Sequence, residues 1–268
     1  METKPKPVMI YVFDRDRRFV HIVLESKNTP GTMAGIGSVF QRLGIVMLNG
    51  FAAGERSGKT LWSIFAEANA KVEDLEDAFR SLPTVEDVTV REGVNGLLVD
   101  SQHFPVVMEG GERLVIMRQS MLTDMFGRAK NIFGSGGDVI LYVQGEEYGR
   151  RAAETWAALL GEKFVREHPN EALQTLSAAG WARIELLAFD LDGRRIVVRL
   201  HDNFECLGRK SGGPYSNFVR GYLCGMAQAL MPNVAVQCKE TVCVAAGGEY
   251  CEFETSEEGA KRTGLNPF

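Results

Sequence analysis

The sequence contains no uninterrupted apolar run approaching the ~18 residues that a membrane-spanning helix needs. It has no excess of basic charge either: 30 Lys and Arg stand against 35 Asp and Glu, a net charge of −5, which argues against a large nucleic-acid-binding surface. Its start, Met1–Pro7, is polar and lacks the apolar segment of a signal peptide. We therefore expect a soluble cytoplasmic protein that binds neither a membrane nor nucleic acid directly.

Cysteine is scarce and confined to one part of the chain. All five cysteines lie between Cys206 and Cys251. An odd number of cysteines without a secretion signal argues against a disulfide framework, and their clustering favours a metal site or reactive thiols. Buried cysteines that act as small apolar residues are the alternative interpretation.

Signatures of catalysis are also missing. The four histidines are far apart in the sequence, and Gly134–Gly137 lacks the spacing of a dinucleotide-binding loop. Ala53–Thr60 fits a relaxed P-loop pattern, but a P-loop requires a following helix, whereas Thr60–Ala66 alternates like a strand. We interpret Ala53–Thr60 as a polar hairpin tip and do not expect an enzyme.

The first part of the chain has the pattern of a ferredoxin-like β-α-β-β-α-β domain. The expected strands are Phe19–Glu25, Ile45–Phe51, Thr60–Ala66 and Val85–Arg91, and the expected helices are Thr32–Leu43 and Val72–Leu82. We expect the first and third of these strands to be central and both helices to cover one face. Gly44 is placed to end the first helix.

A Gly- and Pro-containing stretch of weak periodicity, Gly93–Gly111, is the expected linker, which gives domains at 1–95 and 96–268. For the second domain we expect mixed α/β structure with an antiparallel sheet. Its expected helices are Leu114–Phe133, Glu146–Glu162, Asn170–Ala178 and Asn217–Leu230, its expected strands are Val139–Val143, Ala182–Asp190, Arg195–His201, Val234–Ala245 and Tyr250–Glu254, and Ser256–Phe268 is expected to be a polar tail.

The last expected hairpin carries two cysteines. Cys243 and Cys251 are equidistant from Gly247, and directly opposed Cβ atoms lie roughly 4.5–5.5 Å apart, close enough for two thiolates to share one zinc ion. Glu240 lies three residues before Cys243, on the opposite face of a regular strand, so joint ligation requires a bulge or bend. From spacing alone, a metal site, a bare thiol pair and a buried apolar pair all stay open.

These residues belong to a longer pattern that resembles the vinyl-4-reductase domain family. The pattern is Gly221-x3-Gly225, then Val236-x3-Glu240-x2-Cys243-x3-Gly247-x3-Cys251-x-Phe253, and its earlier pieces are Gly145–Gly149, Gly180–Ala182 and Asn203–Cys206. The resemblance covers residues 105–255. It implies a small-molecule sensor domain related to regulators that respond to aromatic hydrocarbons.

The same resemblance implies a structural zinc ion. In the aromatic sensors the ligands are a cysteine at the start of the Gly-x3-Gly helix, a glutamate and two cysteines, which match Glu240, Cys243 and Cys251 here. Ser216 stands where the helix-start cysteine is expected, and serine is a poor zinc ligand. We therefore name Cys206 as the fourth ligand, with Cys238 and Cys224 as weaker candidates.

The N-terminal pattern resembles the ACT domain family, which comprises small regulatory modules that often bind amino acids. The resemblance rests on Asn28–Met33 and Leu43–Val46 and spans residues 18–92, with Asn28 in place of the usual aspartate. It implies a ligand site at Asn28, Gly31, Thr32 and Met33, where free backbone N–H groups at a helix N-terminus suit a carboxylate. The alternative is a domain that only dimerises.

Together these patterns predict a dimeric, non-enzymatic regulatory protein that binds a small molecule and passes the signal to a separate partner protein. Its second domain would bind a small hydrophobic or aromatic compound, with Trp156 and Trp181 among the aromatic residues of the pocket. The alternatives are a reductase or reductase accessory in tetrapyrrole metabolism, and a non-catalytic assembly or tethering module.

Overall fold

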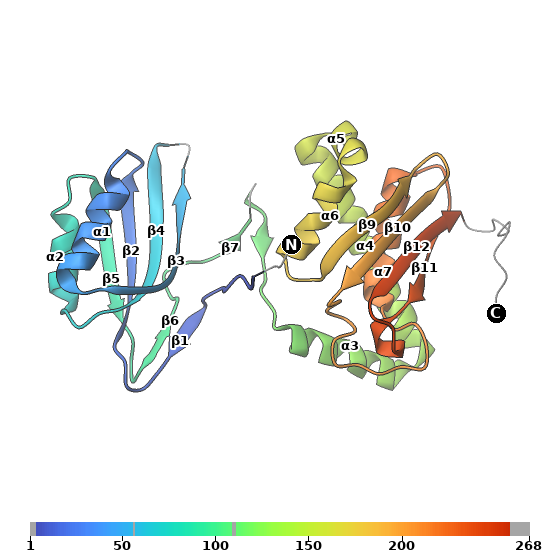
Figure 1. Cartoon of the computed structure of the whole chain (residues 1–268), viewed down its shortest axis with the longest axis horizontal. Coiled ribbons are helices and arrows are strands. Elements are labelled where there is room, and N and C mark those ends of the chain that lie inside the picture. The colour runs from blue at the N-terminus through green and yellow to red at the C-terminus, as the bar shows by residue number, and fades with distance from the viewer. Residues whose placement is uncertain (1–3, 56, 109–110, 258–268) are drawn as a thin grey trace. The chain divides into compact units, whose positions relative to one another are not determined.

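The computed structural model describes residues 4–55, 57–108 and 111–257. The chain divides into two compact units, Met1–Val115 and Ile116–Phe268, each with a core of its own. The sequence placed this boundary between residues 95 and 96, so residues 96–115, expected at the start of the second domain, instead pack with the first unit. Figure 1 labels the elements of both units.

The first unit contains a four-stranded antiparallel sheet with two helices. The strands are β2 (Phe19–Lys27), β3 (Val46–Gly54), β4 (Lys59–Glu67) and β5 (Val85–Glu92), and the helices are α1 (Thr32–Leu43) and α2 (Val72–Arg80). The strand order is β3-β4-β2-β5. Both the β-α-β-β-α-β order and the central position of the first and third of these strands are therefore confirmed.

Both helices pack on one face of this sheet. Alternate residues of a strand share a face, so β2 presents a row of apolar side chains on the side that the helices cover. The core between sheet and helices contains Val20, Ile22 and Leu24 of β2, Ile36 and Val39 of α1, and Leu75 and Phe79 of α2. Gly44 ends α1 in the left-handed conformation (φ 63°), as its position in the sequence predicts.

Part of the other face of the sheet is covered by residues 97–103, which belong to the stretch that the sequence identified as a linker. Within it, β6 (Leu97–Val99) pairs with β1 (Tyr11–Phe13), and Leu98 is buried against Phe19 and Phe65. A second short pair, β7 (Val106–Val107) with β8 (Arg113–Leu114), follows. The linker expectation is wrong because short apolar segments can form strands that weak periodicity does not reveal.

The P-loop-like segment is the tip of the β3–β4 hairpin. β3 ends at Gly54 and β4 begins at Lys59, so a strand follows the motif in place of the helix that phosphate binding needs. Arg56, a part of the pattern, lies outside the described residues. The interpretation as a hairpin tip is confirmed.

The second unit packs helices against another four-stranded antiparallel sheet, of order β11-β12-β10-β9. Its strands are β9 (Arg183–Asp190), β10 (Arg195–His201), β11 (Val236–Val242) and β12 (Cys251–Glu257), with a short 3-10 helix, η2, at Val244–Ala246. Its α-helices are α3 (Gln119–Phe133), α4 (Ser135–Leu160), α5 (Glu162–Glu167), α6 (Pro169–Ala178) and α7 (Asn217–Leu230). This architecture agrees with the mixed α/β fold and antiparallel sheet expected from the sequence.

Three expectations for this unit need correction. Val139–Val143 is a part of the long helix α4 and not a strand, and α4 also contains most of the helix expected at Glu146–Glu162. A short apolar run cannot be assigned by periodicity alone, and here Leu141 is buried while Val139 and Val143 are exposed, as in a helix. The helix expected from Leu114 begins at Gln119. The expected tail begins within β12, and its residues 258–268 lie outside the described residues.

Helices α4 and α7 approach each other closely through two pairs of glycines. A methyl group on Gly149 would lie 2.0 Å from the carbonyl oxygen of Tyr222, and one on Gly225 would lie 2.0 Å from that of Glu146. Gly145 and Gly221 face the partner helix in the same way. Only glycine leaves room for this backbone contact, which holds α7 firmly against α4.

Among the described ranges of the chain, no helix combines the length and hydrophobicity needed to span a bilayer.

Candidate functional site

Four residues from separate elements converge at one end of the second sheet. Cys206 lies in the loop between β10 and α7, Glu240 lies on β11, Cys243 precedes η2 and Cys251 begins β12. All four are buried, and one candidate ligand atom from each lies within 4.8 Å of the others. The structure thus brings together the four residues that the sequence named.

A bulge makes this convergence possible. The pairing of β11 with β12 shifts register between Glu240 and Val242. A regular strand would direct Glu240 and Cys243 to opposite faces, and the extra residue rotates them toward the same side. The bulge that joint ligation requires is therefore present.

The sulfur atoms are spaced for a tetrahedral ion. Cys206 Sγ lies 3.7 Å from Cys243 Sγ and 3.6 Å from Cys251 Sγ. Four ligands at ~2.3 Å from a zinc ion stand about 3.8 Å apart, whereas a disulfide needs about 2.05 Å. All five cysteines are free thiols.

Glu240 is oriented by the backbone at the start of α7. Its Oε2 accepts hydrogen bonds from the amides of Tyr215 (2.8 Å) and Ser216 (3.0 Å). Its Oε1 accepts a hydrogen bond of 2.8 Å from the Ser216 hydroxyl, whose oxygen lies 3.0 Å from Cys206 Sγ. Ser216 therefore occupies the position expected for a helix-start cysteine but serves as a hydrogen-bonding residue beside the cluster, while Cys206 supplies the third sulfur.

The three thiols differ in acidity. The hydrogen bond between Cys251 and Cys206 lowers the pKa of Cys251 to about 7, while the same bond and burial raise the pKa of Cys206. Burial and the neighbouring Glu240 raise the pKa of Cys243 to about 11. Since thiolates are the form that binds metals, Cys251 is the first ligand available near neutral pH, and a cation would draw the protons from the other two.

Glu205 lies beside the cluster, next to Cys206 in the chain, and the sequence pattern does not reveal its role. Its carboxylate is fully buried and accepts hydrogen bonds from the amides of Phe218 (3.2 Å) and Val219 (2.9 Å) in the first turn of α7. Lys130 Nζ lies 3.6 Å from it. Burial outweighs these partners and raises the pKa of Glu205 to about 7. Glu205 lies outside the few residues at the start of α7 where a capping residue is recognised from sequence, so no local sequence pattern predicts that it caps this helix.

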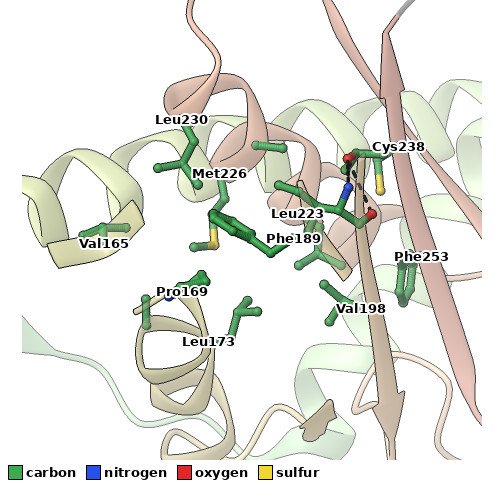
Figure 2. Close-up of a pocket in the computed structure, with 14 residues that line it drawn as sticks. Val165, Pro169, Leu173, Phe189, Val198, Leu223, Met226, Leu230, Cys238 and Phe253 are labelled. Atoms are coloured by element: carbon green, nitrogen blue, oxygen red, sulfur yellow. Dashed lines mark hydrogen bonds between the residues drawn. The ribbon is translucent and has the colours of Figure 1, made fainter. Parts of the chain in front are cut away.

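An apolar pocket lies between the sheet and helices α5, α6 and α7. Figure 2 shows Leu173, Phe189 and Met226 directed toward the same space. The wall is formed almost entirely of apolar side chains: Val165, Pro169, Ala172, Leu173, Phe189, Ile196, Val198, Leu223, Met226, Ala227, Leu230, Cys238, Phe253 and Thr255. The free cavity is about 30 Å³, room for one or two water molecules.

The aromatic residues proposed from the sequence lie elsewhere. Neither Trp156 nor Trp181 lines this pocket. Trp181 packs against Tyr222 and Phe204, with ring centres 4.9 Å and 5.3 Å away. The aromatic residues of the wall are Phe189 and Phe253. The alternation of apolar and polar residues along a strand predicts that such residues are buried, but it does not predict that they line a pocket.

The ligand residues expected in the first unit meet at the β2–α1 turn. Gly31 precedes α1 with φ 92°, and the buried Thr32 donates a hydrogen bond of 3.0 Å to the Lys27 carbonyl. The Met33 side chain is 69% exposed. Asn28 precedes this turn, and its backbone amide donates a 2.8 Å hydrogen bond to the Gly58 carbonyl.

Comparison with known proteins identifies one family match. The sequence model of the vinyl-4-reductase domain matches residues 196–257, from β10 to the end of β12. No curated protein matches the chain.

Several solved structures are similar to parts of the chain. The phenol-responsive sensory domain of the transcription activator PoxR, solved with phenol, is 18% identical over 55% of this chain and 78% of its own, with a TM-score of 0.47. A vinyl-4-reductase family protein from Methanocaldococcus jannaschii is 17% identical over 55% and 99%, with a TM-score of 0.33. For the first unit, the ACT domain of GTP pyrophosphokinase from Chlorobium tepidum is 15% identical over 27% and 96%, with a TM-score of 0.25.

The family match contains the whole candidate metal centre, since Cys206, Glu240, Cys243 and Cys251 all lie between residues 196 and 257. This segment of the second unit is therefore similar to a vinyl-4-reductase domain.

Proposed function

We propose that this protein is a non-enzymatic sensor whose second unit binds a small apolar or aromatic molecule in the pocket and holds a structural zinc ion at Cys206, Glu240, Cys243 and Cys251. The observation that carries the proposal is that the pocket and the candidate metal centre share the same strands. The similarity of residues 196–257 to a vinyl-4-reductase domain supports it.

The donor set fits zinc. Three sulfurs and one carboxylate oxygen form a complete tetrahedral shell, and soft thiolates select zinc over the hard divalent cations. Four protein ligands leave no open position for a water molecule, so the ion would stabilise the fold and do no chemistry on a substrate. By joining the β10–α7 loop to β11 and β12, it would fix the position of that loop relative to the final hairpin.

Two of those elements, β11 and β12, also contribute to the pocket wall. On β11, Cys238 lines the pocket two residues before Glu240, and on β12 Phe253 lines it two residues after Cys251. Residues two apart on a strand share a face. A ligand that displaces the wall would therefore shift the strands and α7 together, which gives binding a route to a change in conformation.

The pocket favours a small apolar ligand. Its wall offers one hydroxyl, that of Thr255, and no charged group. Thr255 Oγ1 already accepts a hydrogen bond of 2.9 Å from the Ile196 amide. Since the free cavity is narrow, a ligand the size of a benzene ring requires flexible wall residues such as Met226 and Leu230 to move, and unbranched methionine adapts readily.

Binding can be tested with a panel of phenols, alkylbenzenes and short fatty acids on the zinc-loaded full chain, followed by thermal unfolding and isothermal titration calorimetry. We expect at least one compound to stabilise the protein, and Ala172→Phe, which fills the pocket, to abolish the effect. Ala178→Phe on the exposed end of the same helix is the control and keeps it. Failure of every compound, or an unchanged response in Ala172→Phe, would contradict the pocket assignment.

We further propose that the first unit is an ACT-like regulatory module that takes an amino acid carboxylate at the start of α1, and that the protein acts as a homodimer with a separate partner protein. Exposed apolar side chains on α3 and α4, among them Met125, Phe133 and Val139, suit a protein contact. Native mass spectrometry reports the subunit count directly. Oxidation of a reduced nicotinamide cofactor by the purified protein would contradict the non-enzymatic assignment.

A further inference from the structure

A second cluster of potential metal ligands lies in the first unit, on the sheet face opposite the helices. His21 projects from the central strand β2, and the turn that follows β6 brings Asp100 and His103 over it. One candidate ligand atom from each residue lies within 4.8 Å of the others. His21 is fully buried, and its ring stacks on Phe65 with centres 4.4 Å apart.

Two ring nitrogens in this cluster lack hydrogen-bond partners among the described residues. They are Nδ1 of His21 and Nε2 of His103, both inaccessible to solvent. Leaving a buried polar nitrogen unpaired costs roughly 1–3 kcal/mol. The other His21 nitrogen, Nε2, lies 2.9 Å from Ser63 Oγ. A ring held by its Nε2–H directs the lone pair of Nδ1 toward Asp100, whose Oδ1 lies 3.8 Å away.

Asp100 is held in place by its own loop. Its Oδ1 accepts hydrogen bonds from the backbone amides of Gln102 (3.0 Å) and His103 (3.2 Å). The His103 ring nitrogen Nδ1 lies 3.0 Å from each carboxylate oxygen. The carboxylate and both rings are therefore positioned before any ligand binds.

The protonation states suit a cation. Burial lowers the pKa of His21, so its imidazole is neutral at pH 7, the form that binds metals. Partial burial acts to raise the pKa of Asp100, but hydrogen bonds from Gln102 and His103 outweigh it, so the pKa is lowered and the carboxylate is ionised. The neutral imidazole of His21, the imidazole of His103 and the carboxylate of Asp100 supply the nitrogen and oxygen donors that first-row divalent metals prefer.

We propose that His21, Asp100 and His103 form a binding site for a divalent transition-metal cation in the first unit, with His21 Nδ1, a carboxylate oxygen of Asp100 and an imidazole nitrogen of His103 as ligands. The site is distinct from the cysteine cluster and independent of the function proposed above. Asp100 and His103 follow β6, so a bound cation would fix this covering segment to the sheet.

The same atoms could be interpreted as a Ser63–His21–Asp100 hydrolytic triad, but the geometry opposes this. Ser63 is 2% exposed, so no substrate reaches its hydroxyl. Asp100 Oδ1 lies 3.8 Å from His21 Nδ1, beyond hydrogen-bond distance, and its partners are the amides of Gln102 and His103 and the His103 ring. Neither feature obstructs a metal ion, which would lie between the ring and the carboxylate.

The test is a zinc titration of the metal-free, reduced full chain, followed by long-range ¹H–¹⁵N spectra of the imidazoles. The chain has four histidines, so each can be assigned with single variants. We expect the nitrogens of His21 and His103 to shift with zinc while those of His168 and His201 do not. Because this readout observes only imidazoles, it separates the site from the cysteine cluster, whether or not that cluster binds zinc.

Variants complete the test. Asp100→Asn is expected to weaken zinc binding at this site more than about 100-fold, and Ser63→Ala, which removes the partner of His21 Nε2, about 10–100-fold. His168→Ala, an exposed histidine in the second unit, is the matched control and leaves binding unchanged. Unshifted His21 and His103 resonances at saturating zinc would overturn the proposal, as would equal affinity in wild type and Asp100→Asn.

Discussion

At the scale of single residues, the cysteine cluster depends on small differences between similar side chains. The Ser216 hydroxyl oxygen lies 3.0 Å from Cys206 Sγ, but only Cys206 offers a thiol to a metal ion. The Ser216 hydroxyl instead donates a hydrogen bond to Glu240 and orients its carboxylate. Two further cysteines, Cys224 and Cys238, are equally buried but lie outside the cluster. Position relative to Glu240, and not burial, distinguishes the candidate ligands.

The zinc assignment predicts that Cys251→Ser loses stoichiometric metal and lowers the melting temperature, because one ligand and the most acidic thiol disappear together. Each kcal/mol of lost stability lowers the midpoint by about 2–4 °C in a unit of this size. Metal content by mass spectrometry and thermal unfolding measure both effects. The control is Cys224→Ser, whose hydroxyl can replace the thiol that donates to the Val236 carbonyl. Full metal content in Cys251→Ser would contradict the assignment of Cys251 as a zinc ligand.

Lys130 stabilises the buried Glu205, so Lys130→Met should cost about 3–5 kcal/mol by leaving that carboxylate uncompensated. The pKa of Glu205 is about 7 in the folded protein, above its ordinary value of 4.5, so the folded state binds the extra proton and loses stability as pH rises through this range. Removing Lys130 raises that pKa further. Urea unfolding should therefore show a larger loss at pH 8 than at pH 5; a pH-independent loss would contradict this.

At the scale of elements, the contact between α4 and α7 positions the start of α7, which holds both Glu240 and Glu205 through its amides. The contact relies on Gly145, Gly149, Gly221 and Gly225. The geometry of the candidate metal centre thus depends on the packing of α7 against α4.

Gly149→Ala is expected to destabilise the second unit by about 1–3 kcal/mol, because the added methyl group would lie 2.0 Å from the Tyr222 carbonyl and force the helices apart. Gly136→Ala at the start of the same helix is the matched control, since its methyl group meets only Phe133 Cβ, at 3.9 Å. Equilibrium urea denaturation compares the two. Similar stabilities would mean that the helices can separate at no cost.

At the scale of the whole molecule, the boundary between the two units, after Val115, determines which fragment of the chain contains the complete first unit. The first unit includes β6, whose Leu98 is buried against Phe19 and Phe65. A fragment of residues 1–115 should therefore be more stable than one of residues 1–95 by about 2 kcal/mol or more, the value of one buried leucine. Chemical denaturation of the two fragments tests this, and equal stability would place residues 96–115 outside the first unit.

The sequence by itself determined those elements whose signals are local. Helices Thr32–Leu43 and Asn217–Leu230 were predicted to the residue, because apolar periodicity and end residues lie within the helix itself. The residues of the cysteine cluster followed from spacing and family resemblance, and that they bind zinc stays a prediction.

Only the tertiary structure decided what depends on contacts between distant segments. It placed Val139–Val143 in a helix, paired residues 97–99 with β1, and brought His21 close to Asp100 and His103. It also set the distances in the cysteine cluster, where the Sγ atom of Cys206 lies 3.7 Å from that of Cys243 and 3.6 Å from that of Cys251. Each of these outcomes is set by the burial and pairing of segments far apart in the chain, and no local pattern of residue types encodes which segments meet.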